Sequence, residues 1–321
     1  METLDAHHTA VIALGGNAIS SAQGHGTLEE QRAAVQDSAA QIAEIIADGR
    51  RVVLTHGNGP QVGALLLQQE LSSEDVPPVP LDVCVAMTQG QIGYLFQQAL
   101  RQTLAERGIS QPVASVTTQA VVDPEDGAFD RPSKPIGPFY TEAEAERFAN
   151  QPGYVIERVG QGERPYRRVV PSPDPLEIVE AANIASMVAN DQLVIACGGG
   201  GVPVIRRNGQ LEGIDAVIDK DLATERLASS LDAETLMILT DVERVAVRYG
   251  TPEQAELDRV SLADAKAYLE NGEFPAGSMG PKVKAAVRFL ENGGRRAVIT
   301  SLRQARDGLD GEAGTSVVQT T

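Results

Sequence analysis

The segment from Val194 to Ala228 constrains this chain more than any other, because it joins a run of glycines to a lysine at the start of a helix. It opens with a short apolar run, Val194 to Cys197, which predicts a buried strand. Four glycines follow at positions 198–201. Glycine has no Cβ and tolerates positive φ, so such a run can bring backbone N–H groups close to an anion.

The second part of this segment predicts a hairpin and then a helix. Asn208-Gly209 is a pair suited to a tight hairpin turn, and apolar residues between positions 222 and 228 recur at helical spacing. Lys220 therefore lies at or just before a helix N-terminus, where the dipole does not favour a cation unless an anion is nearby. An isolated lysine between two aspartates is usually a solvated surface residue, but the glycine run upstream favours a phosphate site.

Composition limits the classes of protein to which the chain can belong. Its 321 residues, 42% of them hydrophobic, are enough for one large or two ordinary domains. A net charge of −17 disfavours nucleic acid as a partner, and it also fits a saline habitat. No apolar run reaches the roughly 18 residues of a membrane span, and the first residues lack a secretory pattern. Cys84 and Cys197 have apolar neighbours and no metal-ligand spacing, which predicts free thiols. We expect a cytoplasmic protein.

Two strands in the first half each end in a Gly/Asn turn that leads toward a helix. Residues 10–14 precede Gly15-Gly16-Asn17, and residues 51–55 precede His56-Gly57-Asn58-Gly59. In an open α/β sheet such turns gather at the carboxyl edge, where ligands bind. The turns match neither the dinucleotide fingerprint nor the Walker A sequence. His56 is a candidate base, although a hydrogen-bonded loop histidine explains it equally simply.

Residues 123–175 interrupt the alternation of strands and helices, because prolines and glycines are dense there. A loop of this length is typical of a lid or a small subdomain. Phe129, Phe139 and Tyr140 are the candidates for its core. Lys134 follows Pro132-Ser133 and precedes Pro135, which stiffens the backbone around it. It is either a solvated loop lysine or a cation that the lid carries to a ligand.

The last third adds a further strand end and a third lysine. Residues 235–239 predict a strand that ends at Thr240-Asp241-Val242, and Gly277 to Lys282 places a lysine at a glycine-flanked helix start. The alternating elements predict a three-layer αβα sandwich with a mostly parallel central sheet and a small protruding lid subdomain. Glycine turns and lysines without a zinc motif or a Ser/His/Asp set favour phosphoryl transfer, in which the protein positions reactants and offsets charge.

At this point a family resemblance can be stated. The chain contains ALGGNAI, THGNGPQVG, RPSKPIGPFY, ACGGGGVPV, AVIDKDLA, ILTDVERV and GSMGPKV, in this order and spread from residue 11 to residue 283. Together these motifs resemble those of the carbamate kinases within the amino acid kinase family. RPSKPIGPFY discriminates best, since the protruding subdomain that carries it is particular to carbamate kinases.

The resemblance implies a reversible reaction, ATP plus carbamate giving ADP plus carbamoyl phosphate, with Mg²⁺ and in a homodimer. It implies that the enzyme makes ATP from carbamoyl phosphate in arginine catabolism. It also implies a carbamate-binding lobe (1–122 and 176–192), a lid (123–175) and a nucleotide-binding lobe (193–321). The protein side chains themselves are not expected to provide a metal site.

The resemblance also implies roles for individual residues. The expected catalytic residues are Lys134, Lys220, Asp221 and Lys282. The expected substrate-binding residues are Gly15, Gly16, Asn17, Gly57, Asn58, Gly59, Gly199 and Gly200. The expected nucleotide-binding residues are Asp241, Val242, Tyr249, Met279 and Val283.

Physical chemistry is compatible with these roles. Carbamate is already an anion, so its oxygen needs no general base, and several preorganised donors must offset its repulsion from the γ-phosphate. Two alternatives stay open, namely another acid or phosphate-monoester kinase of the same fold and a non-catalytic sensor of small anions. An NAD-dependent oxidoreductase is more distant, because the dinucleotide fingerprint is missing.

Overall fold

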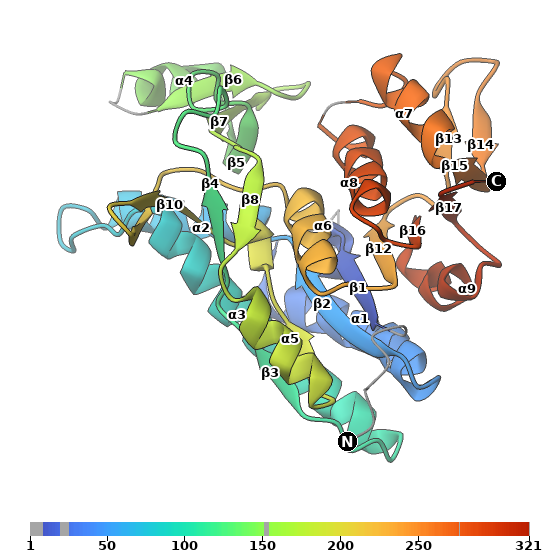
Figure 1. Cartoon of the computed structure of the whole chain (residues 1–321). Helices are drawn as coiled ribbons and strands as arrows, with labels where there is room; N and C mark the ends of the chain where they lie inside the picture. Colours follow the sequence, from blue (N-terminus) through green and yellow to red (C-terminus); the bar gives the residue numbers. More distant parts are fainter. Residues whose placement is uncertain (1–8, 20–25, 151–153, 276, 321) are drawn as a thin grey trace.

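An eight-stranded sheet runs through the centre of the chain, which we describe from a computed structural model for residues 9–19, 26–150, 154–275 and 277–320 (Figure 1). Its order is β15 (Arg259–Ser261), β17 (Thr315–Val318), β16 (Arg296–Ser301), β12 (Thr235–Thr240), β1 (Thr9–Leu14), β2 (Arg51–His56), β9 (Leu193–Ile195) and β3 (Val113–Ser115). Neighbouring strands are parallel except β16 and β17. The prediction of a mostly parallel sheet is therefore confirmed.

Helices cover both faces of this sheet. Along β1, residues 10, 12 and 14 join one apolar core and residues 11 and 13 join the other, as the alternation of a strand requires. The first core packs under α1 (Leu28–Ala47), α3 (Leu81–Glu106) and α9 (Ala305–Asp310). The second packs under α5 (Ala181–Ala189), α6 (Lys220–Ser230), α7 (Leu262–Glu270) and α8 (Met279–Glu291). The three-layer αβα sandwich is confirmed.

A second sheet lies beside the first and leads to the lid. It contains β11 (Gln210–Gly213), β10 (Val202–Arg207), β4 (Gln119–Val122) and β8 (Pro175–Ile178). The predicted hairpin is present, since Asn208 and Gly209 have φ of 51° and 81° between β10 and β11. The helix α2 (Gly59–Leu71) packs with α3 on this sheet. A short hairpin of β13 (Val245–Val247) and β14 (Ala255–Leu257) lies elsewhere in the chain.

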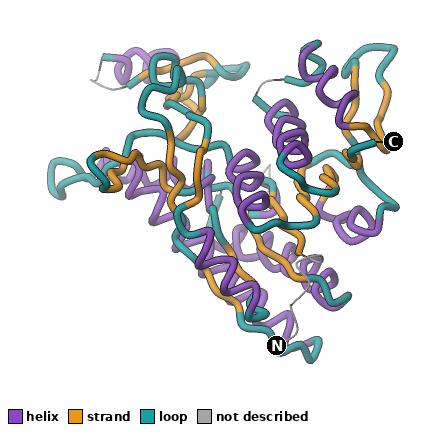
Figure 2. The backbone as a smooth tube through the Cα atoms, viewed as in Figure 1, coloured by secondary structure: helices purple, strands orange, loops and turns teal. Residues whose placement is uncertain are grey.

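The lid is a small αβ unit that stands away from the central sheet (Figure 2). It contains β5 (Lys134–Tyr140), α4 (Glu142–Ala149), β6 (Val155–Arg158) and β7 (Tyr166–Val170). Its buried core includes Tyr140 and Phe148. The expectation was right for Tyr140 and wrong for two other aromatics. Phe139 is 47% exposed, because successive residues of a strand face opposite sides, and Phe129 packs against the main core instead.

Across the described residues, no helix combines the length and the apolar character that crossing a membrane requires.

Candidate active site

The glycine turns of the first half lie side by side at the carboxyl edge of the central sheet. Leu14 and His56 are paired residues at the ends of β1 and β2, so Gly15 and Gly57 follow neighbouring strand ends. The strand β12, on the other side of β1, ends at Thr240. Together with the first turn of α6, these strand ends form the floor of the site.

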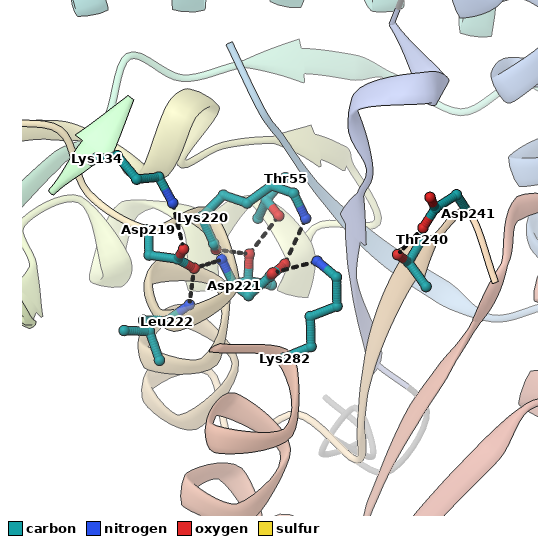
Figure 3. A network of polar contacts seen from close by, with 10 residues as sticks. Thr55, Lys134, Asp219, Lys220, Asp221, Leu222, Thr240, Asp241 and Lys282 are labelled. Atoms are coloured by element: carbon teal, nitrogen blue, oxygen red, sulfur yellow. Dashed lines mark hydrogen bonds and ion pairs between the residues drawn. The ribbon is translucent and has the colours of Figure 1, made fainter. Parts of the chain in front are cut away.

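One buried carboxylate holds two lysines in this site (Figure 3). Asp221 Oδ1 accepts a hydrogen bond from Lys220 Nζ at 2.5 Å, and Oδ2 accepts one from Lys282 Nζ at 2.8 Å. Burial alone would raise the pKa of Asp221, but the two ammonium groups hold it below its usual range. Burial lowers the pKa of Lys220 despite the opposing effect of Asp221. The lysines come from α6 and from the first turns of α8.

The third lysine reaches the same place from the lid. Lys134, the first residue of β5, donates from Nζ to Asp219 Oδ2 at 2.7 Å. Asp219 is the N-cap of α6, since its Oδ1 accepts hydrogen bonds from the backbone N–H groups of Asp221 and Leu222. Figure 3 shows the three lysines pointing toward these two aspartates from three different elements.

Two cavities meet at Lys134 and Lys220, which line both of them. The first has a volume of about 370 Å³, and its lining includes Gly15, Gly16, Thr240, Asp241, Gly277, Ser278 and Lys282. The second has a volume of about 180 Å³, and its lining includes Gly57, Asn58, Gly59, Gly199 and Ile136. In the part of the chain that the structure describes, the lining of the second cavity contains two lysines and no carboxylate. The arrangement can therefore hold two anionic groups on either side of a cationic boundary.

The glycine run after β9 is required for close packing around this second cavity. Gly199, Gly200 and Gly201 have φ between 64° and 92°. A Cβ on Gly199 would lie 2.2 Å from the side chain of Asn58, and one on Gly200 would lie 2.5 Å from the carbonyl oxygen of Ile218. Only Gly199 of the run lines the cavity. The glycine run thus allows the β2 turn and the segment that leads into α6 to pack closely against it. The sequence did not indicate this packing role.

His56 is a buried and neutral residue of the β2 turn. Its Nδ1 lies 2.9 Å from the carbonyl oxygen of Gly57, which requires Nδ1 to carry the proton. Burial lowers the pKa of His56 to about 4. Such a group is a poor base at neutral pH, so the structure favours the interpretation of His56 as a hydrogen-bonded loop histidine.

The expected nucleotide residues are not all brought together. Asp241 lines the first cavity, where its Oδ1 accepts a hydrogen bond from Thr240. Met279 begins α8 near that cavity, whereas Val283 is buried in the core beneath it. Val242 follows Asp241 and is partly buried, and Tyr249 lies 70% exposed beyond β13. These assignments stay predictions.

Some residues of the site were missed at the sequence level. Gly277 and Ser278 line the first cavity, and their signal was the glycine-flanked start of α8. In the sequence, Asp219 was noted only as one of the two aspartates beside Lys220. Asn17 lies in the turn after β1, but its side chain is outside the described residues.

The protein offers little with which to hold a metal ion by itself. Among the described residues, no group of three or more His, Cys, Asp or Glu side chains is placed to hold one. Both oxygens of Asp221 already accept hydrogen bonds from lysines. The absence of a protein metal site stays a prediction.

Comparisons with known proteins show which family the chain resembles over most of its length. The model of the amino acid kinase family matches residues 8–301. The carbamate kinase of Thermococcus kodakarensis is 54% identical over 313 residues, which cover 96% of this chain and 98% of that protein. Carbamate kinase 2 of Enterococcus faecalis is 48% identical over 96% of this chain and 98% of that protein. The structure of carbamate kinase from Giardia lamblia bound to AMP-PNP has a TM-score of 0.90 and 45% identity, and it covers 97% of this chain and 98% of that one.

Proposed function

Because the chain belongs to the amino acid kinase family, and because carbamate kinases resemble it along almost its whole length, we propose that it is an ATP-dependent carbamate kinase. The reaction is reversible phosphoryl transfer between ATP and carbamate. The observation that carries the proposal is the convergence of three lysines, of which Lys134 and Lys220 form the boundary between two cavities and Lys282 lines the first cavity beside them. Such a boundary suits a transferring phosphoryl group, whose charge must be offset.

The roles of the two cavities follow from their size and charge. The larger one, of about 370 Å³, is assigned to the nucleotide and its phosphates. The smaller one, of about 180 Å³, is assigned to carbamate or to the carbamoyl group of carbamoyl phosphate. Its lysines and glycine turns suit an anion of a few heavy atoms. This volume disfavours the alternative of a kinase for a larger acid.

The chemistry requires positioning rather than proton transfer. In the direction of ATP formation, a β-phosphate oxygen of ADP attacks the phosphorus of carbamoyl phosphate, and the bond from phosphorus to the carbamate oxygen breaks. Carbamate leaves as an anion, so no general base or acid is needed, in agreement with the low pKa of His56. Lys220 and Lys282 would stabilise the transferring group, with Asp221 fixing both ammonium groups. Lys134 would approach from the lid.

Mg²⁺ enters this proposal as the counter-ion of the nucleotide. The described side chains form no cage for it, so its ligands would be mainly phosphate oxygens and water. When bound, it would supply charge neutralisation on the phosphates.

The homodimer belongs to the proposal and is supported by one face of α3. Val83, Met87 and Tyr94 are exposed apolar residues at spacings of four and seven, which places them on one stripe of the helix. Gly90 lies on the same stripe, and its Cβ position is open. A second copy of α3 could approach closely at this glycine, and the stripe would then be buried.

Cellular context is also part of the proposal. Buried free thiols at Cys84 and Cys197 suit a reducing compartment, which favours the cytoplasm. Carbamoyl phosphate is a mixed anhydride with high phosphoryl-transfer potential, so ATP formation is the favourable direction. This direction agrees with a role at the end of arginine catabolism.

A coupled assay of ATP formation from ADP and carbamoyl phosphate, with MgCl₂ and purified protein, tests the proposed function. We expect turnover with carbamoyl phosphate and none with an acyl phosphate whose acyl group is much larger than the carbamoyl group. Turnover only with another acyl phosphate would indicate the acid-kinase alternative. Binding of carbamoyl phosphate without turnover would indicate the small-anion sensor.

A further inference from the structure

Asp219 connects the lid to the helix that carries Lys220 and Asp221. One of its oxygens accepts the two N-cap hydrogen bonds of α6. The other accepts the hydrogen bond from Lys134 Nζ at 2.7 Å. The Asp219 side chain is only 14% exposed, so its contact with Lys134 is less screened than a surface ion pair. One carboxylate thus anchors a helix terminus and a lid cation together.

The position of this ion pair is what gives it a function. Lys134 lines both cavities, and Asp219 lines the first one beside Lys220. A free lysine side chain samples many rotamers, so it is a poor preorganised donor unless something restrains it. Asp219 provides that restraint next to the boundary where the phosphoryl group is expected.

In this structure, the lid strand that begins at Lys134 contacts the body of the protein. A Cβ on Gly63 of α2 would lie 2.3 Å from the Cα of Gly137 on β5, so the lid strand touches the body of the protein. Lys134 is therefore held beside Asp219 while the lid strand contacts the body.

We propose that Asp219 is a positioning residue, which holds the Lys134 ammonium group beside the phosphoryl position and releases it to the transferring phosphoryl group. The inference rests on the proposed function for its kinetic consequence. Two simpler roles compete with it. Asp219 could act only as a helix cap, or only as a negative charge that repels anionic substrates.

The variant Asp219→Asn separates these roles, because asparagine caps a helix as well as aspartate but carries no charge. The positioning role predicts that kcat falls about tenfold while KM for carbamoyl phosphate does not rise. A cap alone predicts unchanged kcat and KM, and charge repulsion alone predicts a lower KM with unchanged kcat. Asp219→Ser, which keeps a cap but is too short to reach Lys134, should behave like Asp219→Asn. An unchanged kcat in these variants would overturn the proposal.

A double-mutant cycle with Lys134→Met tests whether Asp219 acts through Lys134. We expect the double variant Lys134→Met/Asp219→Asn to have the same kcat as Lys134→Met alone. Effects that multiply would show that Asp219 acts independently of Lys134, and would contradict the proposal.

A measurement without turnover separates failure of this proposal from failure of the proposed function. Amine labelling followed by mass spectrometry reports how free each lysine is. In Asp219→Asn, labelling of Lys134 should rise severalfold, while Lys266, paired with Glu291, serves as an unchanged internal control. If wild-type protein shows no carbamate kinase turnover, the labelling result still decides whether Asp219 restrains Lys134. Unchanged labelling of Lys134 would count against the restraint.

Discussion

Replacing Asp221 with asparagine should uncouple the two buried lysines of the site. In the structure, the Asp221 side chain is 4% exposed, and it accepts hydrogen bonds from Lys220 at 2.5 Å and from Lys282 at 2.8 Å. Removing one partner of a buried ion pair typically costs about 3–5 kcal/mol of stability, because the remaining charge is left uncompensated. Loss of a preorganised donor typically costs about 3 kcal/mol of transition-state stabilisation. We therefore expect kcat to fall by about a hundredfold or more.

The kcat of Asp221→Asn should depend on pH differently from the kcat of wild type. Burial and the neighbouring Lys282 lower the pKa of Lys220, whereas Asp221 raises it. Without the Asp221 charge, the pKa of Lys220 falls further, and its ammonium group loses the proton at a lower pH. The basic limb of the kcat profile should therefore move to lower pH in Asp221→Asn than in wild type. Acidification within the range where the protein stays folded should recover part of the activity.

The coupled assay of ATP formation measures both effects, and urea unfolding measures stability. Asp37→Asn, an exposed substitution on α1, controls for the loss of a carboxylate charge from an already acidic chain. The reasoning is refuted if folded Asp221→Asn keeps kcat within threefold of wild type and keeps the same pH profile. That outcome would mean that the two lysines are held by something other than Asp221.

Other perturbations test the remaining parts of the site. The pKa of His56 is about 4 in the folded protein against its usual 6.5, so the folded protein favours the neutral imidazole and loses stability as pH falls below 6.5. Urea unfolding should show that the free energy of unfolding of wild type falls by about 2 kcal/mol more than that of His56→Asn between pH 8 and pH 5. Gly199→Ala should lower the free energy of unfolding by about 1–3 kcal/mol or more and weaken carbamoyl phosphate binding, because φ of Gly199 is 64° and Asn58 occupies the Cβ position. The control Gly127→Ala faces open space, so it should change neither urea unfolding nor KM. If the proposed homodimer forms through α3, Met87→Lys should be monomeric in analytical ultracentrifugation, and Ala33→Lys on α1 should stay dimeric. A dimeric Met87→Lys would place the interface elsewhere.

Local sequence signals were sufficient to predict the sheet and its ligand-binding edge. Each strand that ends in a Gly/Asn turn contains its own signal, because apolar runs and turn residues are short-range features. The helix start at Lys220 was predictable for the same reason, since the helical spacing of the apolar residues between positions 222 and 228 is a short-range pattern. The parallel order then follows from the alternation of strands and helices.

Contacts between distant segments could not be predicted in the same way. Lys134 and Asp219 are separated by 85 positions, so only the packing of the lid on the body shows that they form an ion pair. The side of β5 that faces the lid core was equally hidden, and this led to the wrong assignment of Phe139. The glycine run was assigned to anion contact, but the structure gives Gly200 a packing role against Ile218. A glycine in the sequence indicates that there is little room for a Cβ atom, and only the structure shows which group lies close to it.

A chain with a large negative charge should repel substrates that are all anions, and the structure explains how it can still bind them. The net charge is −17, yet the described residues that line the second cavity include two lysines and no carboxylate. Exposed charges more than about 8–10 Å apart are largely screened at physiological ionic strength, whereas buried groups are screened much less. The acidic surface therefore weakens long-range attraction of the substrates, and the buried lysines determine what happens after contact. Beside the boundary between the cavities, three ammonium groups face the carboxylates of Asp219 and Asp221. These ammonium groups can offset the charge of a phosphoryl group locally, although the chain as a whole is acidic.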